Sequence, residues 1–376
     1  MKNKNKHFFL IAGESSGDLH GSELIVQLKA IDPNISFAGI GGPLMQKEGL
    51  ASIAPIEKMA VMGFWEVIKQ IRFFLNLEKK TLKNIGTNSS VVDGVILIDY
   101  PGFNLRIAKK IKEEFPLIPI IYYISPQVWA WKEKRVKNIK KYVDRLIAIF
   151  PFEVDWYKNK AVSIEYFGHP LIDQWKKRKQ CNTNNKLQKF TVGLFPGSRK
   201  QEIDKHLPVF IDLIKNKHQI SYEVEFVVSQ PSLVSSSLFG YFQQNNIPIL
   251  SCSLYETLEK CDLAIVASGT ATLECAISNT PFIVIYKMSF VSWFITRRLI
   301  DLKFASIVNI LANKQIVPEL LQKNLNIKNI IKELNHFLDK KTYNNTKKEL
   351  VNVVNLLGDG RAYEQAAKLI YEESNC

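Results

Sequence analysis

The chain has 376 residues, more than one hydrophobic core usually holds, so two domains are expected. Its hydrophobic content of 46% and charged content of 23% are typical of a globular protein. The five cysteines are odd in number and show no C-x-x-C spacing, which argues for a reducing compartment and against a disulfide framework or a zinc site. The net charge of +14 favours anionic partners, but no nucleic-acid-binding module is legible, so nucleic acid is not expected as a partner.

The first twelve residues superficially resemble a signal peptide. Their apolar part is short, however, and Glu14 and Asp18 follow directly, so the segment is interpreted as a first buried strand. The longest uncharged run, 115–131, contains Pro116, Pro119 and Pro126, so no transmembrane helix is expected.

Apolar segments alternate with helical patterns along the chain, which is typical of parallel α/β architecture. In the first half, strands are predicted at 8–12, 36–40, 95–98, 118–123, 146–150 and 164–167, with helices at 19–30, 104–115 and 133–142. In the second half, strands are predicted at 190–195, 223–228, 247–250, 263–267 and 282–286, and the pattern after Pro318 is helical.

The segment 173–186 is polar and without periodicity, so we interpret it as part of a linker between two domains. The predicted boundaries are a first Rossmann-like domain at 1–172, a linker at 173–188, a second Rossmann-like domain at 189–345 and C-terminal helices at 346–376. The last helix, 360–373, is expected to fold back on the first domain. In such doubly wound sheets, ligands bind beyond the carboxyl ends of the strands.

The stretch 262–274 carries the most information. A buried strand ends in Ser268, Gly269 and Thr270, and a helix follows, so unpaired backbone N–H groups favour a phosphate there. Glu274 lies about one turn further on, where a carboxylate accepts hydrogen bonds from ribose hydroxyls. The alternative is a plain strand-to-helix corner with a serine N-cap.

A second corner of this kind ends the strand 190–195. It contains Gly197, which allows close backbone approach, then Ser198 and Arg199, whose planar guanidinium suits a diphosphate. Neither a D-x-D motif nor a His/Asp cluster at metal spacing is present, so no metal is expected. Two corners together favour a nucleotide site in the second half.

In the first half, Asp99 ends a buried strand, where partial burial would raise its basicity toward that of a general base. It could instead be a turn residue before Pro101. The loop 12–21 adds Asp18 and His20 as polar groups aimed at the cleft. The alternative makes Asp18 a helix N-cap and His20 a surface residue.

The segment 59–77 is rich in apolar and aromatic residues beside Lys69 and Arg72. A basic amphipathic helix of this kind lies in a bilayer interface or admits acyl chains. The expected contact residues are Val61, Met62, Phe64, Trp65, Ile68 and Phe73. The alternative is an ordinary helix packed on the sheet, and the same two interpretations apply to 289–298.

Seven motifs together resemble one family. They are 13–18 (GESSGD), 60–63 (AVMG), 125–131 (SPQVWAW), 167–169 (FGH), 196–199 (PGSR), 267–275 (ASGTATLEC) and 306–312 (SIVNILA). A single S-G-T-x-T-x-E is shared by many nucleotide-sugar enzymes, but the ordered set, spanning nearly the full chain, resembles the lipid-A-disaccharide synthases.

This resemblance implies a GT-B glycosyltransferase, with two Rossmann-like doubly wound domains facing across a cleft and the sugar nucleotide held mainly by the second. It implies transfer from UDP-2,3-diacylglucosamine to the 6-hydroxyl of 2,3-diacylglucosamine 1-phosphate, giving the β-1,6-linked lipid A disaccharide 1-phosphate and UDP. No cofactor is implied. The expected location is the cytoplasmic face of the anionic inner membrane of a Gram-negative bacterium, and the family commonly forms dimers.

An α-linked donor that yields a β linkage implies inversion, hence one displacement with a single base. The resemblance implies Asp99 as that base, whether alone or with His20 or Asp18, and Arg199 as a diphosphate contact. Ser268, Gly269, Thr270 and Glu274 then fit the UDP site. Asn309 lies in a family motif and is placed with the sugar-nucleotide residues, without an assigned role.

Two other functions share parts of this pattern. A UDP-N-acetylglucosamine 2-epimerase has the same fold and a similar nucleotide corner, but a soluble sugar gives no reason for the aromatic segments. A non-catalytic UDP-sugar-binding protein would tolerate loss of Asp99.

Overall fold

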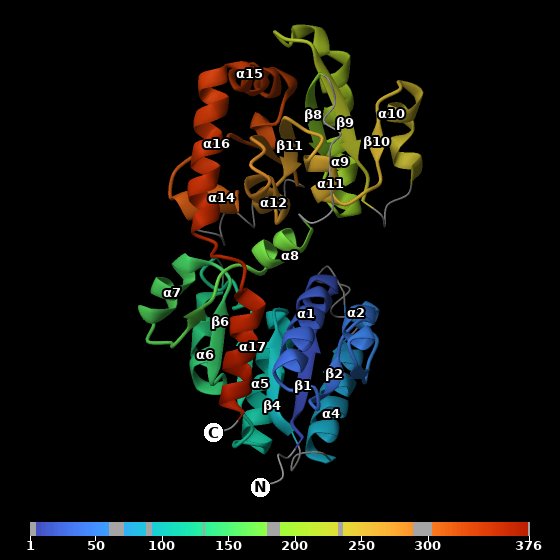
Figure 1. Ribbon diagram of the computed structural model, residues 1–376. Coiled ribbons are helices and arrows are strands. Elements are labelled where there is room, and N and C mark those ends of the chain that lie inside the picture. The colour runs from blue at the N-terminus through green and yellow to red at the C-terminus, as the bar shows by residue number, and fades with distance from the viewer. Residues whose placement is uncertain are drawn as a thin grey trace. The chain divides into compact units, whose positions relative to one another are not determined.

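The computed structural model describes residues 5–59, 71–87, 92–130, 132–178, 189–231, 236–288 and 303–374 (Figure 1). The chain divides into two compact units. The first comprises Met1–Gln174 together with Leu357–Cys376, and the second comprises Trp175–Leu356.

Within the described residues, the first unit contains a seven-stranded parallel sheet in the order β3-β2-β1-β4-β5-β6-β7. Its strands are β1 (His7–Ala12), β2 (Ser36–Ile40), β3 (Leu50–Ser52), β4 (Val92–Ile98), β5 (Ile120–Tyr123), β6 (Arg145–Ala148) and β7 (Glu165–Tyr166). Its helices are α1 (Ser15–Ile31), α2 (Pro43–Lys47), α4 (Ile71–Thr87), α5 (Pro101–Glu114), α6 (Val136–Tyr142), α7 (Pro151–Lys158) and α17 (Ala362–Glu373), while α8 (Pro170–Arg178) spans the boundary between the units.

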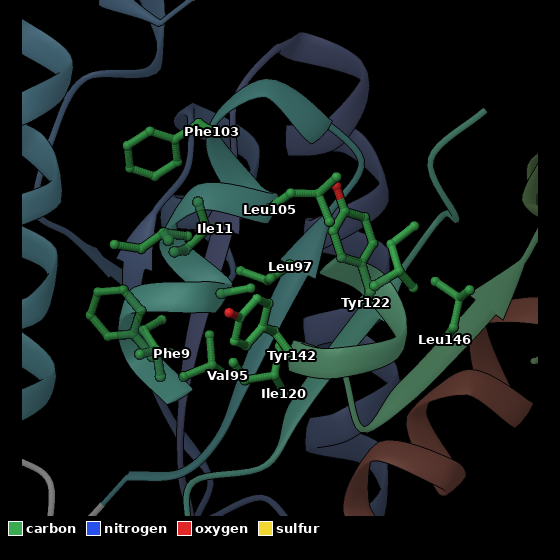
Figure 2. Close-up of a cluster of buried hydrophobic side chains, with 14 of the residues drawn as sticks. Phe9, Ile11, Val95, Leu97, Phe103, Leu105, Ile120, Tyr122, Tyr142 and Leu146 are labelled. Carbon is green, nitrogen blue, oxygen red and sulfur yellow. The ribbon is translucent and has the colours of Figure 1, made fainter. Parts of the chain in front are cut away.

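Alternate residues of β1 enter two different cores, because successive side chains of a strand point to opposite faces. Phe9 and Ile11 join the apolar side chains of α4, α5 and α6 on one face, as Figure 2 shows for part of this cluster. Phe8 and Leu10 join those of α1 and α17 on the other face. Burial on both faces explains why these strands are continuous apolar runs in the sequence.

The second unit repeats this plan with a six-stranded parallel sheet in its described residues, in the order β10-β9-β8-β11-β12-β13. The strands are β8 (Phe190–Phe195), β9 (Val224–Ser229), β10 (Ile249–Leu250), β11 (Leu263–Ala267), β12 (Phe282–Tyr286) and β13 (Glu319–Leu321). The helices are α9 (Lys200–Lys215), α10 (Gly240–Gln244), α11 (Leu254–Leu258), α12 (Ala271–Ile277), α14 (Ile307–Ala312), α15 (Ile327–Leu338) and α16 (Lys340–Asn355).

Strand β13 contradicts the expectation that the chain is helical after Pro318. Three residues are too few to show an alternating pattern, and β13 is defined by its parallel pairing with β12. The short strand β3 was missed for the same reason, since only its pairing with β2 identifies it.

The expected linker 173–188 is wrong at its beginning, because α8 continues to Arg178. The end of this helix is rich in charged residues, namely Lys176, Lys177 and Arg178, so its composition is that of a linker although Trp175 is buried. The carboxyl-terminal boundary also differs from the expected 346, since all of α16 belongs to the second unit.

The carboxyl-terminal segment packs in the first unit, where α17 lies beside α1 (Figure 1). The backbone of Gly358 passes so close to Gly168 that a Cβ on Gly358 would lie 2.8 Å from the Gly168 Cα atom. The N–H of His169 donates to the Leu357 carbonyl at 2.7 Å. The glycine of the FGH motif therefore serves this close backbone approach.

Asp173 anchors the start of α17. Its buried carboxylate accepts hydrogen bonds from the N–H groups of Ala362, at 3.3 Å, and Tyr363, at 3.0 Å. An acid at this position satisfies helix N–H groups that lack a partner within the helix and interacts favourably with the helix dipole.

We expect Asp173→Ala to lower the free energy of unfolding by about 1–2 kcal/mol, because two buried N–H groups lose their acceptor. Urea unfolding measures the change. Asp359→Ala is the matched control, since Asp359 is exposed and pairs with the exposed Arg361. An equal effect of the two substitutions would contradict the capping role of Asp173.

Candidate active site

The order of each sheet reverses at one place, between β1 and β4 in the first unit and between β8 and β11 in the second. Such a reversal sends the following helices to opposite faces and leaves a crevice at the carboxyl ends of the strands. Ala12 pairs with Ile98, so the residues after β1 and β4 emerge side by side. In the second unit Val266 pairs with Phe195, so the two predicted corners also adjoin.

Asp99 and Tyr100 form a strained corner after β4, with φ values of 44° and 47° in the left-handed region. Three hydrogen bonds hold it. The Asp99 N–H donates to the Tyr123 carbonyl at 3.0 Å, and the Asp99 carbonyl accepts from Tyr122 Oη at 2.5 Å and Asn104 Nδ2 at 2.7 Å. These contacts fix the backbone, so the position of the Asp99 carboxylate is set by β5 and α5.

Burial raises the pKa of Asp99 to about 6, and the neighbouring carboxylate of Glu14 adds to the rise. A carboxylate with this pKa is ionised at neutral pH yet more basic than an exposed aspartate, which suits a general base. Glu14 is the N-cap residue of α1, and its charge acts on Asp99 because β1 and β4 are neighbours in the sheet.

Asp18 is not a cleft acid, and the alternative of an N-cap for α1 is also wrong. Its carboxylate is buried and accepts the N–H groups of Gly42 at 2.8 Å, Met45 at 3.0 Å and Leu44 at 3.1 Å. Asp18 therefore holds the start of α2. Because residue 18 and the backbone N–H donors of residues 42–45 are far apart in the sequence, a local pattern could not reveal this contact.

His20 is hydrogen bonded within the protein and is not the surface residue of the alternative interpretation. Its Nδ1 lies 2.8 Å from the hydroxyl of Tyr363, which in turn accepts a hydrogen bond from Gln174 Nε2 at 2.8 Å. Burial lowers the pKa of His20 to about 4, so the ring is neutral at pH 7. Tyr363 comes from α17, which the sequence analysis did not connect with the loop 12–21.

Seven of the eight residues predicted for the sugar nucleotide line one pocket of about 460 Å³ in the second unit. They are Gly197, Ser198, Arg199, Ser268, Gly269, Thr270 and Glu274. The pocket walls also include side chains that the sequence analysis did not select, among them Glu202, Gln230 and Ser253. The two corners therefore form one site, as their positions at adjacent strand ends require.

At the first corner, Gly197 has a φ of 108°, and a Cβ there would lie 2.4 Å from Glu202 Oε2. Glu202 thus folds back over the glycine, and its Oε1 lies 3.5 Å from Arg199 Nη1. The Arg199 side chain is 58% exposed, so it has room to turn toward a diphosphate.

At the second corner, burial raises the pKa of Glu274 to about 7, against the opposing charge of Arg178. A carboxyl group with this pKa can accept from one ribose hydroxyl or donate to it. Ser268 uses its own polar groups within the protein, because its N–H donates to the Ile285 carbonyl and its hydroxyl donates to the Ala305 carbonyl at 2.8 Å. Above Gly269 the space is open, since a Cβ there would meet no atom within 4 Å.

Asn309 is the eighth predicted residue, and it does not line the pocket. Its side chain is fully buried and uses its whole hydrogen-bonding capacity within the protein. We therefore assign Asn309 a structural role and no longer include it among the proposed ligand contacts.

The predicted membrane contacts are only partly described. Val61, Met62, Phe64, Trp65 and Ile68 lie outside the described residues, as does the segment 289–298. Phe73 is half-buried, packs against the core of the first unit and makes an edge-to-face contact with Phe74 at 5.4 Å. Phe73 thus fits the alternative interpretation, that of a helix residue packed on the sheet.

Among the described helices, none combines the length and apolar composition needed to cross a bilayer. Across the described ranges, no three His, Cys, Asp or Glu side chains gather in a way that could hold a metal ion.

Solved structures show the class of fold. The chain is similar to a putative UDP-N-acetylglucosamine 2-epimerase from Listeria monocytogenes, with a TM-score of 0.65 and 14% identity over 98% of this chain and 97% of that one. It is similar to the calicheamicin glycosyltransferase CalG4, with a TM-score of 0.64 and 10% identity over 99% and 98%. The architecture is that of the GT-B glycosyltransferases and related epimerases.

Sequence comparisons define the family within that class. The model of the lipid-A-disaccharide synthetase family matches residues 8–371. Lipid-A-disaccharide synthase of Geobacter sulfurreducens is 34% identical, over 99% of this chain and 98% of the relative, and that of Coxiella burnetii is 34% identical over 98% of each. The chain belongs to the lipid-A-disaccharide synthase family, and the resemblance inferred from the motifs is confirmed.

We expect Asp99→Asn to raise the free energy of unfolding at pH 7. The folded-state pKa of Asp99 is raised, so the wild type loses stability as the pH rises from about 4 to above 6, by on the order of 1–3 kcal/mol. Asparagine also tolerates the positive φ. Urea unfolding at pH 4 and pH 7 should show the difference mainly at pH 7, and a variant with no gain at pH 7 would refute the burial argument.

Proposed function

We propose that this chain joins UDP-2,3-diacylglucosamine to 2,3-diacylglucosamine 1-phosphate, releasing UDP and the β-1,6-linked lipid A disaccharide 1-phosphate. The observation that carries the proposal is the single pocket lined by both predicted corners, in a chain that belongs to the lipid-A-disaccharide synthase family. The pocket takes the nucleotide part of the donor. The ribose lies near Glu274, and the diphosphate lies near Arg199 and the backbone of Gly269 and Thr270.

In the proposed reaction, Asp99 accepts the proton of the acceptor's 6-hydroxyl. The hydroxyl oxygen forms the new bond to the anomeric carbon while the bond from that carbon to the diphosphate oxygen breaks, with inversion. UDP leaves with the electron pair of the broken bond. Arg199 and the backbone N–H groups of the corners stabilise the charge on the diphosphate, so this proposed reaction is metal-independent.

Two features of the first unit support the role proposed for Asp99. Its backbone is fixed by three hydrogen bonds, and its raised pKa gives it the basicity that the step needs. We keep Asp99 as the base and withdraw Asp18 from catalysis, because its carboxylate is committed to α2. His20 is neutral at pH 7 and hydrogen bonded to Tyr363, and we assign it no part in the proposed proton transfer.

The test is a mass-spectrometric assay of the two lipid substrates in detergent, with wild type and Asp99→Asn. Wild type should form the tetraacyl disaccharide, and the variant should lose about 10²-fold or more in rate, because it lacks the base. In the wild type, kcat/KM should fall below about pH 6 as Asp99 becomes protonated.

Other outcomes of this assay would contradict specific parts of the proposed reaction. UDP release without disaccharide would exclude the proposed acceptor. Interconversion of UDP-N-acetylglucosamine and its 2-epimer would favour the epimerase function of the fold neighbours. Full activity of Asp99→Asn would exclude Asp99 as the base.

We also propose that the protein binds peripherally to an anionic membrane surface, at the cytoplasmic face of the inner membrane, where both lipid substrates reside. The support is the charge of one face of the first unit. Helices α4, α5 and α6 cover the same face of the sheet, and their cationic residues are Arg72, Lys79, Lys80, Lys83, Arg106, Lys109, Lys110, Lys112, Lys137, Lys140 and Lys141. Their acidic residues are Glu78, Glu113 and Glu114.

The opposite face has the reverse balance, since α1 and α17 carry Glu23, Glu364, Glu372 and Glu373 against Lys29 and Lys368, the remaining acid of α1 being buried. The cationic face also bears exposed apolar side chains near the start of α4, where Ile71 is 47% and Leu75 is 45% exposed. Cations attract anionic lipid, and exposed apolar groups enter the interface. A homodimer remains a proposal from the family resemblance alone.

Replacing Lys137, Lys140 and Lys141 together by Glu should weaken binding to phosphatidylglycerol-containing vesicles by at least about tenfold, since each basic residue near such a surface contributes about 1 kcal/mol. Vesicle co-sedimentation at low and high salt measures the change.

The matched control replaces Lys328, Lys332 and Lys341 of the second unit by Glu, which changes the net charge equally. All three are exposed. If the control weakens vesicle binding as much as the α6 variant, net charge alone governs binding and the proposed face is wrong.

A further inference from the structure

Asn309 lies in a motif that the proposed reaction does not use, yet its side chain is fully buried on α14. Its Nδ2 donates to the Val317 carbonyl at 2.9 Å and to Glu319 Oε1 at 2.8 Å. Its Oδ1 accepts from the N–H groups of Ile316 at 2.8 Å and Val317 at 3.1 Å. These four bonds use the whole hydrogen-bonding capacity of the amide, so Asn309 fixes the approach to β13 and orients Glu319.

Glu319 is the second residue in a series of hydrogen bonds that leads from Asn309 to Ser268. Its Oε1, besides accepting from Asn309, accepts from the N–H of Ser306 at 2.9 Å, and its Oε2 accepts from the N–H of Ala305 at 2.8 Å. Both carboxylate oxygens therefore hold consecutive backbone groups at the start of α14. Hydrogen bonds to a carboxylate are stronger than those between neutral groups, so this segment is firmly placed.

Ala305 is the third link, because its carbonyl accepts the hydroxyl hydrogen of Ser268 at 2.8 Å. Ser268 lines the pocket, and its N–H is also engaged, with the Ile285 carbonyl. A hydroxyl that has donated its only hydrogen presents lone pairs to the pocket and cannot donate to a phosphate oxygen. Ser268 thus connects the corner to the 305–306 backbone.

We propose that Asn309 and Glu319 are positioning residues of the donor site, which hold the corner at Ser268, Gly269 and Thr270 through the backbone of Ala305. This inference rests on the proposed function, in which that corner binds the nucleotide of the donor. The two residues touch no ligand. They hold the Ala305 carbonyl, which in turn holds the Ser268 hydroxyl. The backbone at Gly269 and Thr270 is therefore already in the conformation that binds the diphosphate.

Asn309→Asp is nearly isosteric and tests the first link. It places a carboxylate oxygen where Nδ2 donated, facing Glu319 Oε1 and the Val317 carbonyl, so attraction becomes repulsion. We expect the Kd for UDP, measured by calorimetry, to rise at least about tenfold. In steady-state kinetics, KM for the sugar-nucleotide donor should rise, while KM for the monosaccharide acceptor should stay unchanged.

Glu319→Gln tests the second link independently, and it keeps the inference testable if Asn309→Asp fails to fold. The double variant Asn309→Asp/Glu319→Gln allows the new amide to donate to the new carboxylate. The double variant should therefore lose less UDP affinity than the product of the two single losses, as expected for directly coupled residues.

Asp262→Asn is the matched control, at the other end of β11 from Ser268. Asp262 Oδ2 accepts from the Thr191 N–H at 2.9 Å, so the change should lower thermal stability but leave the Kd for UDP unchanged. If Asp262→Asn raises the Kd as much as Asn309→Asp, the effect is general destabilisation and the inference is wrong.

Two further results separate this inference from the function on which it rests. If folded wild type binds UDP and both Asn309→Asp and Glu319→Gln bind it equally well, the positioning role is refuted and the proposed function stands. If wild type itself binds no UDP, the proposed function of the pocket fails, and the positioning role fails with it.

Discussion

The reversal of strand order within each parallel sheet is the constraint on which both candidate sites depend. At β1 and β4, and again at β8 and β11, neighbouring strands send their helices to opposite faces. The loops that leave such a pair of strands diverge, and the carboxyl ends between them remain open to a ligand. The corner residues were selected from separate stretches of sequence, and they meet because of this topology. The chemistry of each site is then set by what surrounds each side chain.

Three buried or half-buried acids illustrate this dependence. Asp18 is surrounded by backbone N–H groups and holds α2, so its charge is used for structure. Burial and the neighbouring carboxylate of Glu14 raise the pKa of Asp99 to about 6. Burial raises the pKa of Glu274 to about 7 at the wall of the pocket in the second unit. Acids of similar sequence appearance are therefore placed in different surroundings: Asp18 anchors a helix, whereas Asp99 and Glu274 have the raised pKa values on which their proposed roles as base and sugar contact rest.

Contacts from distant parts of the chain complete both units. Tyr363 of the last helix bonds to His20, and Asp173 anchors that same helix, so the first unit depends on residues from the carboxyl end. In the second unit, Asn309 and Glu319 connect β13 and α14 to the Ser268 corner through Ala305. In each unit, then, hydrogen bonds from distant parts of the chain hold residues of the two candidate sites.

The amino-acid sequence was sufficient to predict the parallel α/β class, most of the strands, the family and the two corners that line the pocket of the second unit. These features depend on local order, since apolar runs define buried strands and the residues directly after them must lie at the carboxyl edge. Asp99 could be selected from the sequence for the same reason, since it directly follows a buried strand.

The contacts of Asp18, His20 and Asn309 could be identified only from the folded protein, because their partners lie far along the chain or in another element, at Gly42, Tyr363 and Glu319. It also decided that β3 and β13 are strands, since runs this short are defined by pairing. The sequence showed which polar groups lie near the site. Their use depends on which hydrogen-bonding groups are already satisfied by the fold, and that is a property of contacts between segments rather than of any one segment.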